Sequence, residues 1–372
     1  MMGQQSCATP EGTAAYRARM ANQVAPEHFR QGEGLWLSSV GLGTYLGDED
    51  EETDLRYAEA VTRALQLGCN VLDSAINYRH QRSERVVGRT LAALFARGTA
   101  AREEIVVATK GGFIPFDGAM PADPGLYFRE TYLQPGIVAA RDVVAGCHCM
   151  APRYIQDQLE RSRRNLGLAC VDIYYLHNPE TQLQEVSREE FHRRIRAAFE
   201  VLEAAVAERK IRVYGTATWT GYRQPPTARD HLSLEALVGL AREVGGEGHH
   251  FRVVQLPYNL AMLEAFTKDT QVVDGEAVCF FEAARRLGIT AMVSAPLLQS
   301  QLATGLPPGL EQVLDGLRTD AQRAIQFVRS TPGVSTALVG MKSLAHVEEN
   351  LGVARVAPAP EEQFMRLFTR TS

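Results

Sequence analysis

The sequence contains no apolar run approaching the roughly 18 residues that a membrane-spanning helix needs. Residues 1–30 are polar and rich in alanine, and they lack the apolar core of a signal peptide. Basic residues are not in excess, because 39 Lys and Arg stand against 44 Asp and Glu, for a net charge of -5. A nucleic-acid-binding protein would need a basic face. We therefore expect a cytoplasmic protein that binds neither membranes nor nucleic acid.

Cysteine patterns typical of disulfide frameworks or metal sites are also scarce. Of the six cysteines, Cys69, Cys170 and Cys279 fall in or beside apolar stretches, where a reduced cysteine behaves as a small hydrophobic residue. Only the cluster 147–149, Cys-His-Cys, resembles a metal site. Zinc sites usually show a second, spaced pair of ligands, and the sequence has none. We expect no structural disulfides and no metal.

Short apolar runs alternate instead with segments of helical periodicity along most of the chain. Helices are expected over residues 54–67, 151–166 and 188–209, and from residue 83. The expected strands end at or near Thr44, Asp73, Lys110, His177, Gly215, Gln255, Val293 and Val339. Eight strands separated by helices predict an α/β fold, a single (β/α)8 TIM barrel. We expect an N-terminal extension over residues 1–35 and the barrel over residues 36–372.

Two insertions interrupt this alternation. Residues 112–150 follow the third barrel strand and are far longer than a usual connection, and residues 220–231 follow the fifth strand. Both leave from the carboxyl end of a strand, where a barrel forms its binding face. We expect the first, with its aromatic residues Phe113, Phe116 and Tyr127, to wall a substrate pocket. A surface elaboration or a subunit contact is the alternative.

Four polar residues carry the chemistry that we expect at this face. Asp73, Lys110 and His177 each end a strand, and Tyr78 lies in the loop after Asp73. The carboxyl ends of the strands meet on one face of a barrel, where catalytic residues project. Tyr78 would donate a proton to a carbonyl oxygen, and a nearby lysine ammonium would lower the phenol pKa from about 10. Asp73 would pair with Lys110, and His177 would orient the carbonyl.

In this order the four residues resemble those of the aldo-keto reductase superfamily. The segment 73–78, Asp-Ser-Ala-Ile-Asn-Tyr, followed by Ser83 and Glu84, is similar to the Asp–Tyr signature of that family. Further matches run from residues 41–44 to residues 349–350. The resemblance implies that Asp73, Tyr78, Lys110 and His177 form a catalytic tetrad. Because no side chain donates hydride, it also implies a nicotinamide cofactor.

The resemblance also implies a set of cofactor contacts. At the nicotinamide end these are Gly43, Thr44, Thr216, Thr218, Gln255, Ser294, Pro296 and Leu297. At the adenosine end they are Gly340, Lys342, Ser343, His346, Glu349 and Asn350. Lys342 and Ser343 suit a 2′-phosphate beside a helix N-terminus, so we expect NADP rather than NAD.

The sequence departs from the family pattern at two cofactor positions. Ala217-Thr218 stands where the family has Ser-Asn, and Ser294 stands where it commonly has a Tyr stacked on the nicotinamide. Trp219 or an aromatic residue of the first insertion would compensate for that Tyr. At the adenosine end, His346 stands where many relatives carry Arg. The residues that we expect around the substrate are Tyr45, Phe113, Phe116, Tyr127, Asn178 and Trp219.

The expected protein is thus an NADP-dependent oxidoreductase that transfers hydride between nicotinamide and an aldehyde, ketone or sugar-like carbonyl, or the corresponding alcohol. A non-catalytic, nicotinamide-nucleotide-binding regulatory subunit on the same barrel is the alternative. An unrelated barrel hydrolase or lyase would need a metal cluster or paired acids at other strand ends, which the sequence lacks. The physiological substrate, the reaction direction and the oligomeric state stay open.

Overall fold

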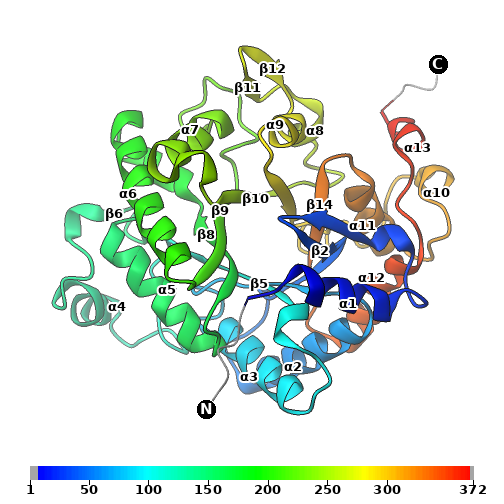
Figure 1. Ribbon diagram of the computed structural model, residues 1–372, viewed down its shortest axis with the longest axis horizontal. Coiled ribbons are helices and arrows are strands. Elements are labelled where there is room, and N and C mark those ends of the chain that lie inside the picture. Colours follow the sequence, from blue (N-terminus) through cyan, green and yellow to red (C-terminus); the bar gives the residue numbers. More distant parts are fainter. Residues whose placement is uncertain (1–6, 369–372) are drawn as a thin grey trace.

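The computed structural model describes residues 7–368, and eight parallel strands in it close into a barrel (Figure 1). Each strand pairs with the next barrel strand along the chain, and the last pairs with the first. The barrel strands are β3 (Val40–Gly43), β4 (Val71–Asp73), β5 (Val106–Gly111), β8 (Val171–His177), β9 (Ile211–Ala217), β10 (Phe251–Pro257), β13 (Thr290–Ser294) and β14 (Val334–Gly340). The predicted (β/α)8 barrel is confirmed.

Helices surround the barrel and connect successive strands. The first of them starts earlier than predicted, because Asp50 caps it by accepting a hydrogen bond from the Thr53 backbone N–H at 2.8 Å. Acidic residues in its first turn also stabilise the start of the helix, because they lie at the positive end of the helix dipole. The main helices are α2 (Glu51–Gln66), α3 (Arg82–Ala96), α5 (Pro152–Leu166), α6 (Arg188–Ala207), α7 (Leu234–Gly245), α9 (Phe280–Arg286), α11 (Asp320–Ser330) and α12 (Leu344–Leu351).

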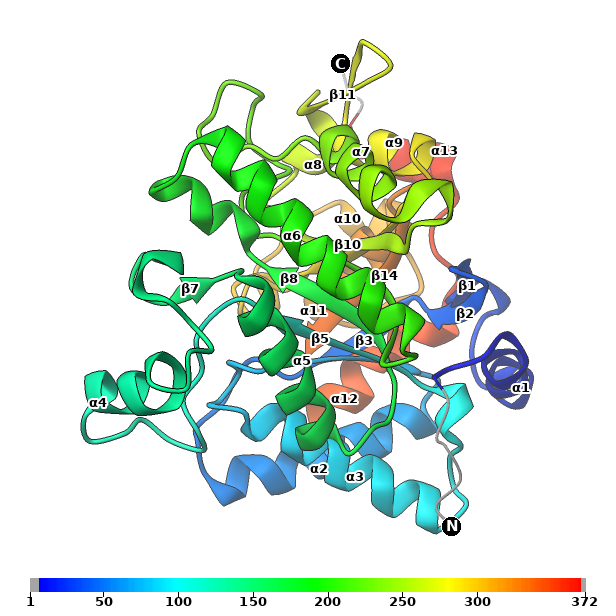
Figure 2. The same cartoon turned by 60° about the vertical axis from the view of Figure 1, so that its left-hand side comes forward.

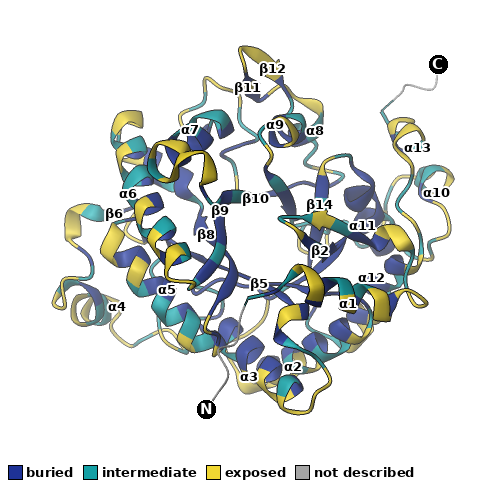
Figure 3. Ribbon diagram, in the orientation of Figure 1, coloured by how far each residue is buried: buried dark blue, intermediate teal, exposed yellow. Residues whose placement is uncertain are grey.

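Burial follows the barrel layers, with the strands buried and the outer helix faces exposed (Figure 3). The inside of the barrel is filled by an apolar cluster whose members include Val71, Ala108 and Tyr175. Side chains two residues apart on a strand share a face. The next residues on this inner face are therefore Asp73, Lys110 and His177, which places all three at the carboxyl end of the barrel.

The N-terminal segment covers the opposite end of the barrel. Helix α1 (Pro10–Met20) precedes the hairpin of β1 (Phe29–Gly32) and β2 (Leu35–Ser38), whose Leu35 and Leu37 join the apolar cluster inside the barrel. Figure 2 shows this hairpin and α4 of the first insertion on opposite sides of the barrel. Cys7 forms a disulfide with Cys170 beside this segment. The expectation that Cys170 is a reduced hydrophobic residue is wrong, because the fold brings the two distant cysteines together.

The first insertion has secondary structure of its own between β5 and α5. Its elements are α4 (Pro124–Phe128), the π-helix η3 (Arg129–Leu133), the 3-10 helix η4 (Ala140–Asp142), and the short strands β6 (Val143–Val144) and β7 (His148–Cys149). Residues 220–231, in contrast, contain no helix or strand.

Further short elements complete the chain. The hairpin of β11 (Gln271–Val273) and β12 (Glu276–Val278) was not anticipated. The remaining helices are α8 (Glu264–Thr267), α10 (Leu310–Val313), α13 (Glu361–Met365), η1 (Pro26–His28), η2 (Arg102–Glu104), η5 (Pro179–Gln184), η6 (Gly246–Gly248) and η7 (Gly352–Arg355). Across residues 7–368 no helix is long and apolar enough to cross a membrane.

Candidate active site

A cavity of about 510 Å³ opens at the carboxyl ends of the barrel strands. Its lining includes Asp73, Tyr78 and His177 of the expected tetrad. A larger groove of about 920 Å³ runs between α2 and α3, but no tetrad residue lines it. The smaller cavity is therefore the candidate active site, since barrel enzymes place their catalytic groups at this end of the strands.

Lys110 joins the members of the tetrad from behind the cavity wall. Its side chain is 0% exposed, and its Nζ donates hydrogen bonds to Asp73 Oδ2 at 2.6 Å, to the Ser74 carbonyl at 2.8 Å and to Tyr78 Oη at 3.3 Å. The His177 ring packs edge-on against the Tyr78 ring, with 5.8 Å between centroids. The structure thus brings together the four residues that the sequence singled out.

The environment of the tetrad sets its protonation. Burial disfavours the ammonium of Lys110, but the nearby Asp73 carboxylate and Tyr78 oxygen raise its pKa above the ordinary value. The pKa of Tyr78 is also raised, because burial and the Asp73 charge outweigh the lowering effect of Lys110. Lys110 thus has the expected lowering effect, but burial makes the net shift of the Tyr78 pKa upward. Tyr78 is a protonated phenol at neutral pH, which suits a proton donor.

His177 is a neutral imidazole in this site. Burial lowers its pKa well below the ordinary value, and the positive charge of Lys110 lowers it further. Its Nδ1 atom is buried without a hydrogen-bond partner in the described structure. A neutral imidazole carries one N–H, so His177 can donate one hydrogen bond to an oxygen held in the cavity.

Most of the residues expected at the nicotinamide end line this cavity. The side-chain amide of Gln255 donates a hydrogen bond to Asp73 Oδ1 at 2.8 Å, so Gln255 contacts the tetrad directly. Thr216 lies outside the lining and hydrogen-bonds Tyr222 Oη at 2.5 Å, whereas Thr218 lines the cavity with its Oγ1 buried and unpartnered. The other expected residues in the lining are Gly43, Thr44, Ser294, Pro296 and Leu297.

The residues expected at the adenosine end lie beyond the cavity, apart from Gly340, which lines it. Ser343 caps α12 by accepting a hydrogen bond from the His346 backbone N–H at 3.3 Å. His346 is exposed, and Lys342 is half-buried. Glu349 lines a separate cavity with residues of α2 and η7, and Asn350 is buried.

The expected substrate residues divide into two groups. Tyr45, Phe113, Asn178 and Trp219 all line the cavity. Phe116 and Tyr127 lie outside its lining, because Phe116 packs on His80 and Tyr127 packs on both Phe116 and Tyr132.

Sequence reasoning missed three polar residues of the lining: Asn77, Gln299 and Ser300. Asn77 directly precedes Tyr78, and the other two follow the seventh barrel strand. Their position in loops after barrel strands was the available signal.

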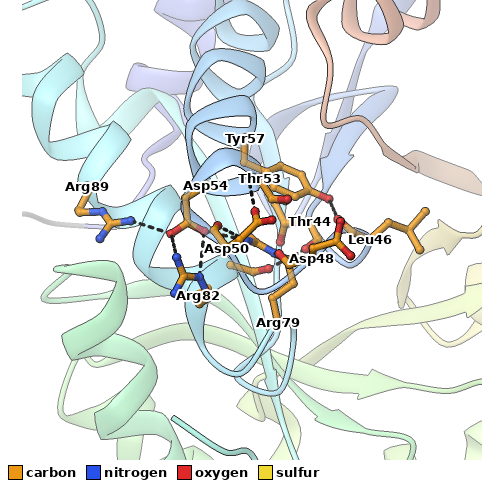
Figure 4. Close-up of polar contacts among 11 residues, drawn as sticks. Thr44, Leu46, Asp48, Asp50, Thr53, Asp54, Tyr57, Arg79, Arg82 and Arg89 are labelled. Carbon is orange, nitrogen blue, oxygen red and sulfur yellow. Dashed lines mark hydrogen bonds and ion pairs between the residues drawn. The ribbon is translucent and has the colours of Figure 1, made fainter. Parts of the chain in front are cut away.

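A cluster of charged residues anchors the loop that follows β3 (Figure 4). Arg79, which directly follows Tyr78, donates to the carbonyl oxygens of Asp48 at 2.7 Å and Asp50 at 3.2 Å, and to Asp54 Oδ1 at 2.7 Å. Residues 79–81 all have positive φ angles, between 49° and 74°. Such a left-handed turn is unfavourable for residues other than glycine, so these contacts compensate for it beside the catalytic candidate.

The start of the second insertion is held by a buried carboxylate. Glu180 Oε1 accepts hydrogen bonds from the backbone N–H groups of Trp219 at 2.6 Å and Thr220 at 3.0 Å. Burial raises the pKa of Glu180, while the backbone donors favour its charged form. Glu180 therefore fixes the loop that carries Trp219 to the cavity.

The Cys-His-Cys cluster of residues 147–149 is not assembled as a metal site. Both ring nitrogens of His148 are hydrogen-bonded within the protein, to the carbonyl of His177 and to Gln182. Cys147 is exposed, whereas Cys149 is buried. Within residues 7–368, no group of three or more His, Cys, Asp or Glu side chains is arranged to hold a metal ion.

Comparison with known proteins agrees with this geometry. The pattern of the aldo/keto reductase family matches residues 39–237. The chain belongs to the aldo/keto reductase family and is an NAD(P)-dependent oxidoreductase.

Two curated relatives illustrate the distance to characterised members. The 6-dehydroglucose reductase of Novosphingobium aromaticivorans is 23% identical over 91% of this chain and 93% of its own length. The NADH-specific methylglyoxal reductase of Escherichia coli is 28% identical over 49% of each chain.

Solved structures share the fold over nearly the whole chain. The holo form of an aldo-keto reductase from Bacillus halodurans has a TM-score of 0.62 at 19% identity, covering 93% of this chain and 97% of that one. An aldo/keto reductase from Klebsiella pneumoniae in complex with NADP and acetate has a TM-score of 0.59 at 21% identity, covering 92% and 95%. At this identity the likeness establishes the fold alone.

Proposed function

We propose that this protein is an NADP-dependent reductase of neutral, polyhydroxylated carbonyl compounds, with Tyr78 as the general acid. The observation that carries the proposal is the contact of Lys110 Nζ with both Asp73 and Tyr78 at the wall of a cavity that also presents His177. No observation favours the alternative of a non-catalytic subunit.

The tetrad has a distinct task for each member. When bound, the nicotinamide supplies the hydride for the carbonyl carbon. Tyr78 donates its phenolic proton to the carbonyl oxygen, and the Lys110 ammonium stabilises the phenolate that is left. Asp73 keeps Lys110 charged and in place, since an unpaired buried ammonium is costly. His177 donates a hydrogen bond to the same oxygen and thereby orients the carbonyl.

The cavity residues fit a nicotinamide cofactor. The unpartnered Oγ1 of Thr218 is a free hydrogen-bonding group for the carboxamide, at the position next to Ala217. Trp219 is 44% exposed and lines the cavity, so its ring is available to stack in place of the Tyr that Ser294 replaces. Lys342 and Ser343 precede α12 and suit a 2′-phosphate. The Klebsiella pneumoniae relative was solved with NADP, which supports the same choice.

The lining of the cavity favours a neutral and polar substrate. In the described chain it contains no lysine or arginine, and its one carboxylate, Asp73, is paired with Lys110. The amide and hydroxyl groups of Asn77, Asn178 and Ser300 suit substrate hydroxyls. The name of the 6-dehydroglucose reductase, which aligns with most of this chain, fits such a substrate.

The test is reduction of a panel of sugar-type and simple carbonyl compounds with NADPH by the wild type and by the Tyr78→Phe variant. We expect wild-type turnover and a loss of roughly a thousandfold in kcat in the variant, because the proton donor is gone. Quenching of NADPH fluorescence should be nearly unchanged. A variant that keeps more than a tenth of wild-type kcat would refute the role of Tyr78. A wild type that binds NADPH but reduces no carbonyl would refute the proposed activity.

A further inference from the structure

His148, in the first insertion, contacts the backbone of His177. Its Nε2 lies 2.7 Å from the His177 carbonyl oxygen, and both residues are buried. A carbonyl oxygen only accepts hydrogen bonds, so Nε2 carries the proton and donates it. The histidine therefore holds the peptide group that links His177 to Asn178, two residues that line the cavity.

Two further residues fix the tautomer and orientation of His148. Gln182 Nε2 donates to His148 Nδ1 at 2.8 Å, which requires Nδ1 to be the unprotonated acceptor. Arg194 Nη1 on α6 donates to Gln182 Oε1 at 2.5 Å, which fixes the orientation of the Gln182 amide. All the donors thus point in one direction along a hydrogen-bond chain from Arg194 through Gln182 and His148 to His177.

The backbone around His148 is built to allow this contact. Cys149 N–H donates to the Gly112 carbonyl at 2.9 Å, and His148 bridges to Phe113, so the end of the insertion pairs with its beginning. A Cβ atom at Gly112 would stand 2.8 Å from both His148 Nε2 and the His177 carbonyl oxygen. With a φ of +151°, Gly112 leaves the space that the hydrogen bond occupies.

The same segment also contacts the His177 ring. Phe113 packs edge-on against the rings of both His148 and His177, with centroid distances of 5.0 Å and 5.1 Å. His177 is thereby held through its carbonyl by His148 and through its ring by Phe113 and Tyr78. Asn178 has a φ of +44°, in the left-handed region that asparagine adopts more readily than most other non-glycine residues, and the fixed peptide group supports this conformation.

We propose that His148 is a positioning residue, which acts through the His177 backbone to hold the imidazole at the angle needed to orient the substrate carbonyl. The inference deepens the proposed function and rests on it, because it assumes that His177 contacts the substrate. It also gives the first insertion a role in catalysis besides lining the cavity. Burial lowers the pKa of His148 to about 4, so the chain keeps its neutral tautomer at neutral pH.

The test compares substitutions that remove or retain the donor. His148→Met removes the N–H at similar size, and His148→Gln replaces Nε2 with an amide N–H. We expect His148→Met to lower kcat by roughly ten- to a hundredfold with the dissociation constant for NADPH unchanged, because misplaced catalytic groups have effects of this order. His148→Gln should recover most of kcat. Gln182→Met removes the donor that fixes the tautomer of His148, and it should lower kcat by a smaller factor.

Tyr132→Phe is the matched control for a merely structural effect. It removes a buried hydrogen bond, from Tyr132 Oη to the Pro115 carbonyl at 3.1 Å, in the same insertion but away from His177. It should lower Tm without changing kcat. The inference is overturned if His148→Met keeps at least half of wild-type kcat, if His148→Gln does not rescue it, or if Tyr132→Phe loses as much kcat.

A readout without turnover separates this inference from the proposed function. The imidazole ¹⁵N resonances of His177 should shift in His148→Met and Gln182→Met but not in Tyr132→Phe. If the wild type reduces no carbonyl, the proposed function fails, and these resonances still show whether His148 positions His177. Unchanged His177 resonances in both folded variants would overturn the inference. If His148→Met does not fold, Gln182→Met decides by the same two measurements.

Discussion

Lys110 illustrates how a single residue combines stability and chemistry. A fully buried ammonium is tolerated only with partners, and Asp73, the Ser74 carbonyl and Tyr78 supply them. The same contacts place the charge beside the phenol that is proposed to lose its proton. Burial nevertheless dominates at Tyr78 and raises its pKa. The phenol is therefore protonated before reaction, and the lysine matters most for the phenolate formed afterwards.

Lys342 is the residue on which we base the preference for NADP. Replacing it with Ala should weaken NADPH binding by about 1.5–3 kcal/mol, because a charge-assisted contact to the 2′-phosphate is lost. NADH lacks this phosphate and should bind with unchanged affinity. Fluorescence titration of both cofactors against wild type and variant measures the difference.

His346→Ala is the control for this prediction, since His346 is an exposed residue in the first turn of α12, close to Lys342 in the sequence. It should weaken NADPH binding less than Lys342→Ala does. An equal loss of affinity for NADPH and NADH in Lys342→Ala would show that this residue does not recognise the phosphate.

The first insertion combines two kinds of packing. Its beginning and end, at Phe113 and His148, contact the candidate active site. Its middle part forms an aromatic cluster in which Phe116, Tyr127 and Tyr132 pack on one another away from the cavity. These aromatic residues cover one another, and His80 of the loop after β4 also packs on Phe116.

This division predicts different outcomes for aromatic substitutions within one element. Phe116→Ala or Tyr127→Ala should destabilise the protein by about 1–3 kcal/mol through lost burial, with preference among carbonyl substrates unchanged. Phe113→Leu should instead change kcat/KM between substrates, because Phe113 lines the cavity and packs on His177. Thermal melting and kcat/KM on the carbonyl panel check both. A shift of substrate preference in Phe116→Ala would place that residue in the pocket after all.

The disulfide connects two distant parts of the whole molecule: the N-terminal segment and the residue that directly precedes β8, the strand that ends at His177. Cys7 and Cys170 are 163 residues apart in sequence. Noncovalent contacts hold the N-terminal segment as well, since Ala8 N–H donates to buried Asp172 at 2.6 Å and Asp172 pairs with Arg102 at 2.7 Å. The disulfide and the Arg102–Asp172 ion pair together fix the N-terminal segment at the end of the barrel opposite the candidate active site.

Removal of the disulfide should lower global stability and leave the active site intact. Cys7→Ser is expected to lose about 2–4 kcal/mol of unfolding free energy, because the unfolded chain regains conformational freedom. Denaturant unfolding with and without a reductant measures it. Reductant should destabilise the wild type by a similar amount and the variant not at all. A wild type insensitive to reductant, or a variant with reduced kcat, would contradict this prediction.

The strand order, the barrel and the convergence of the tetrad were predictable from the sequence. Apolar runs a few residues long specify buried strands locally, and a period of two places Asp73, Lys110 and His177 on one face of them. Parallel strands then bring their carboxyl ends together, whatever the connecting segments do. This part of the fold depends on short-range patterning, which is visible in a single sequence.

The remaining features depend on contacts between residues far apart in sequence. The Cys7–Cys170 disulfide, the chain from Arg194 to His177 and the packing of Phe116 away from the cavity all join segments whose relative position only the folded barrel sets. The raised pKa of Tyr78 has the same origin, because desolvation depends on everything that surrounds the phenol. Local patterning determined that Asp73, Lys110 and His177 reach the active site, and long-range packing decided which residues surround them, how they are held there and in which protonation state.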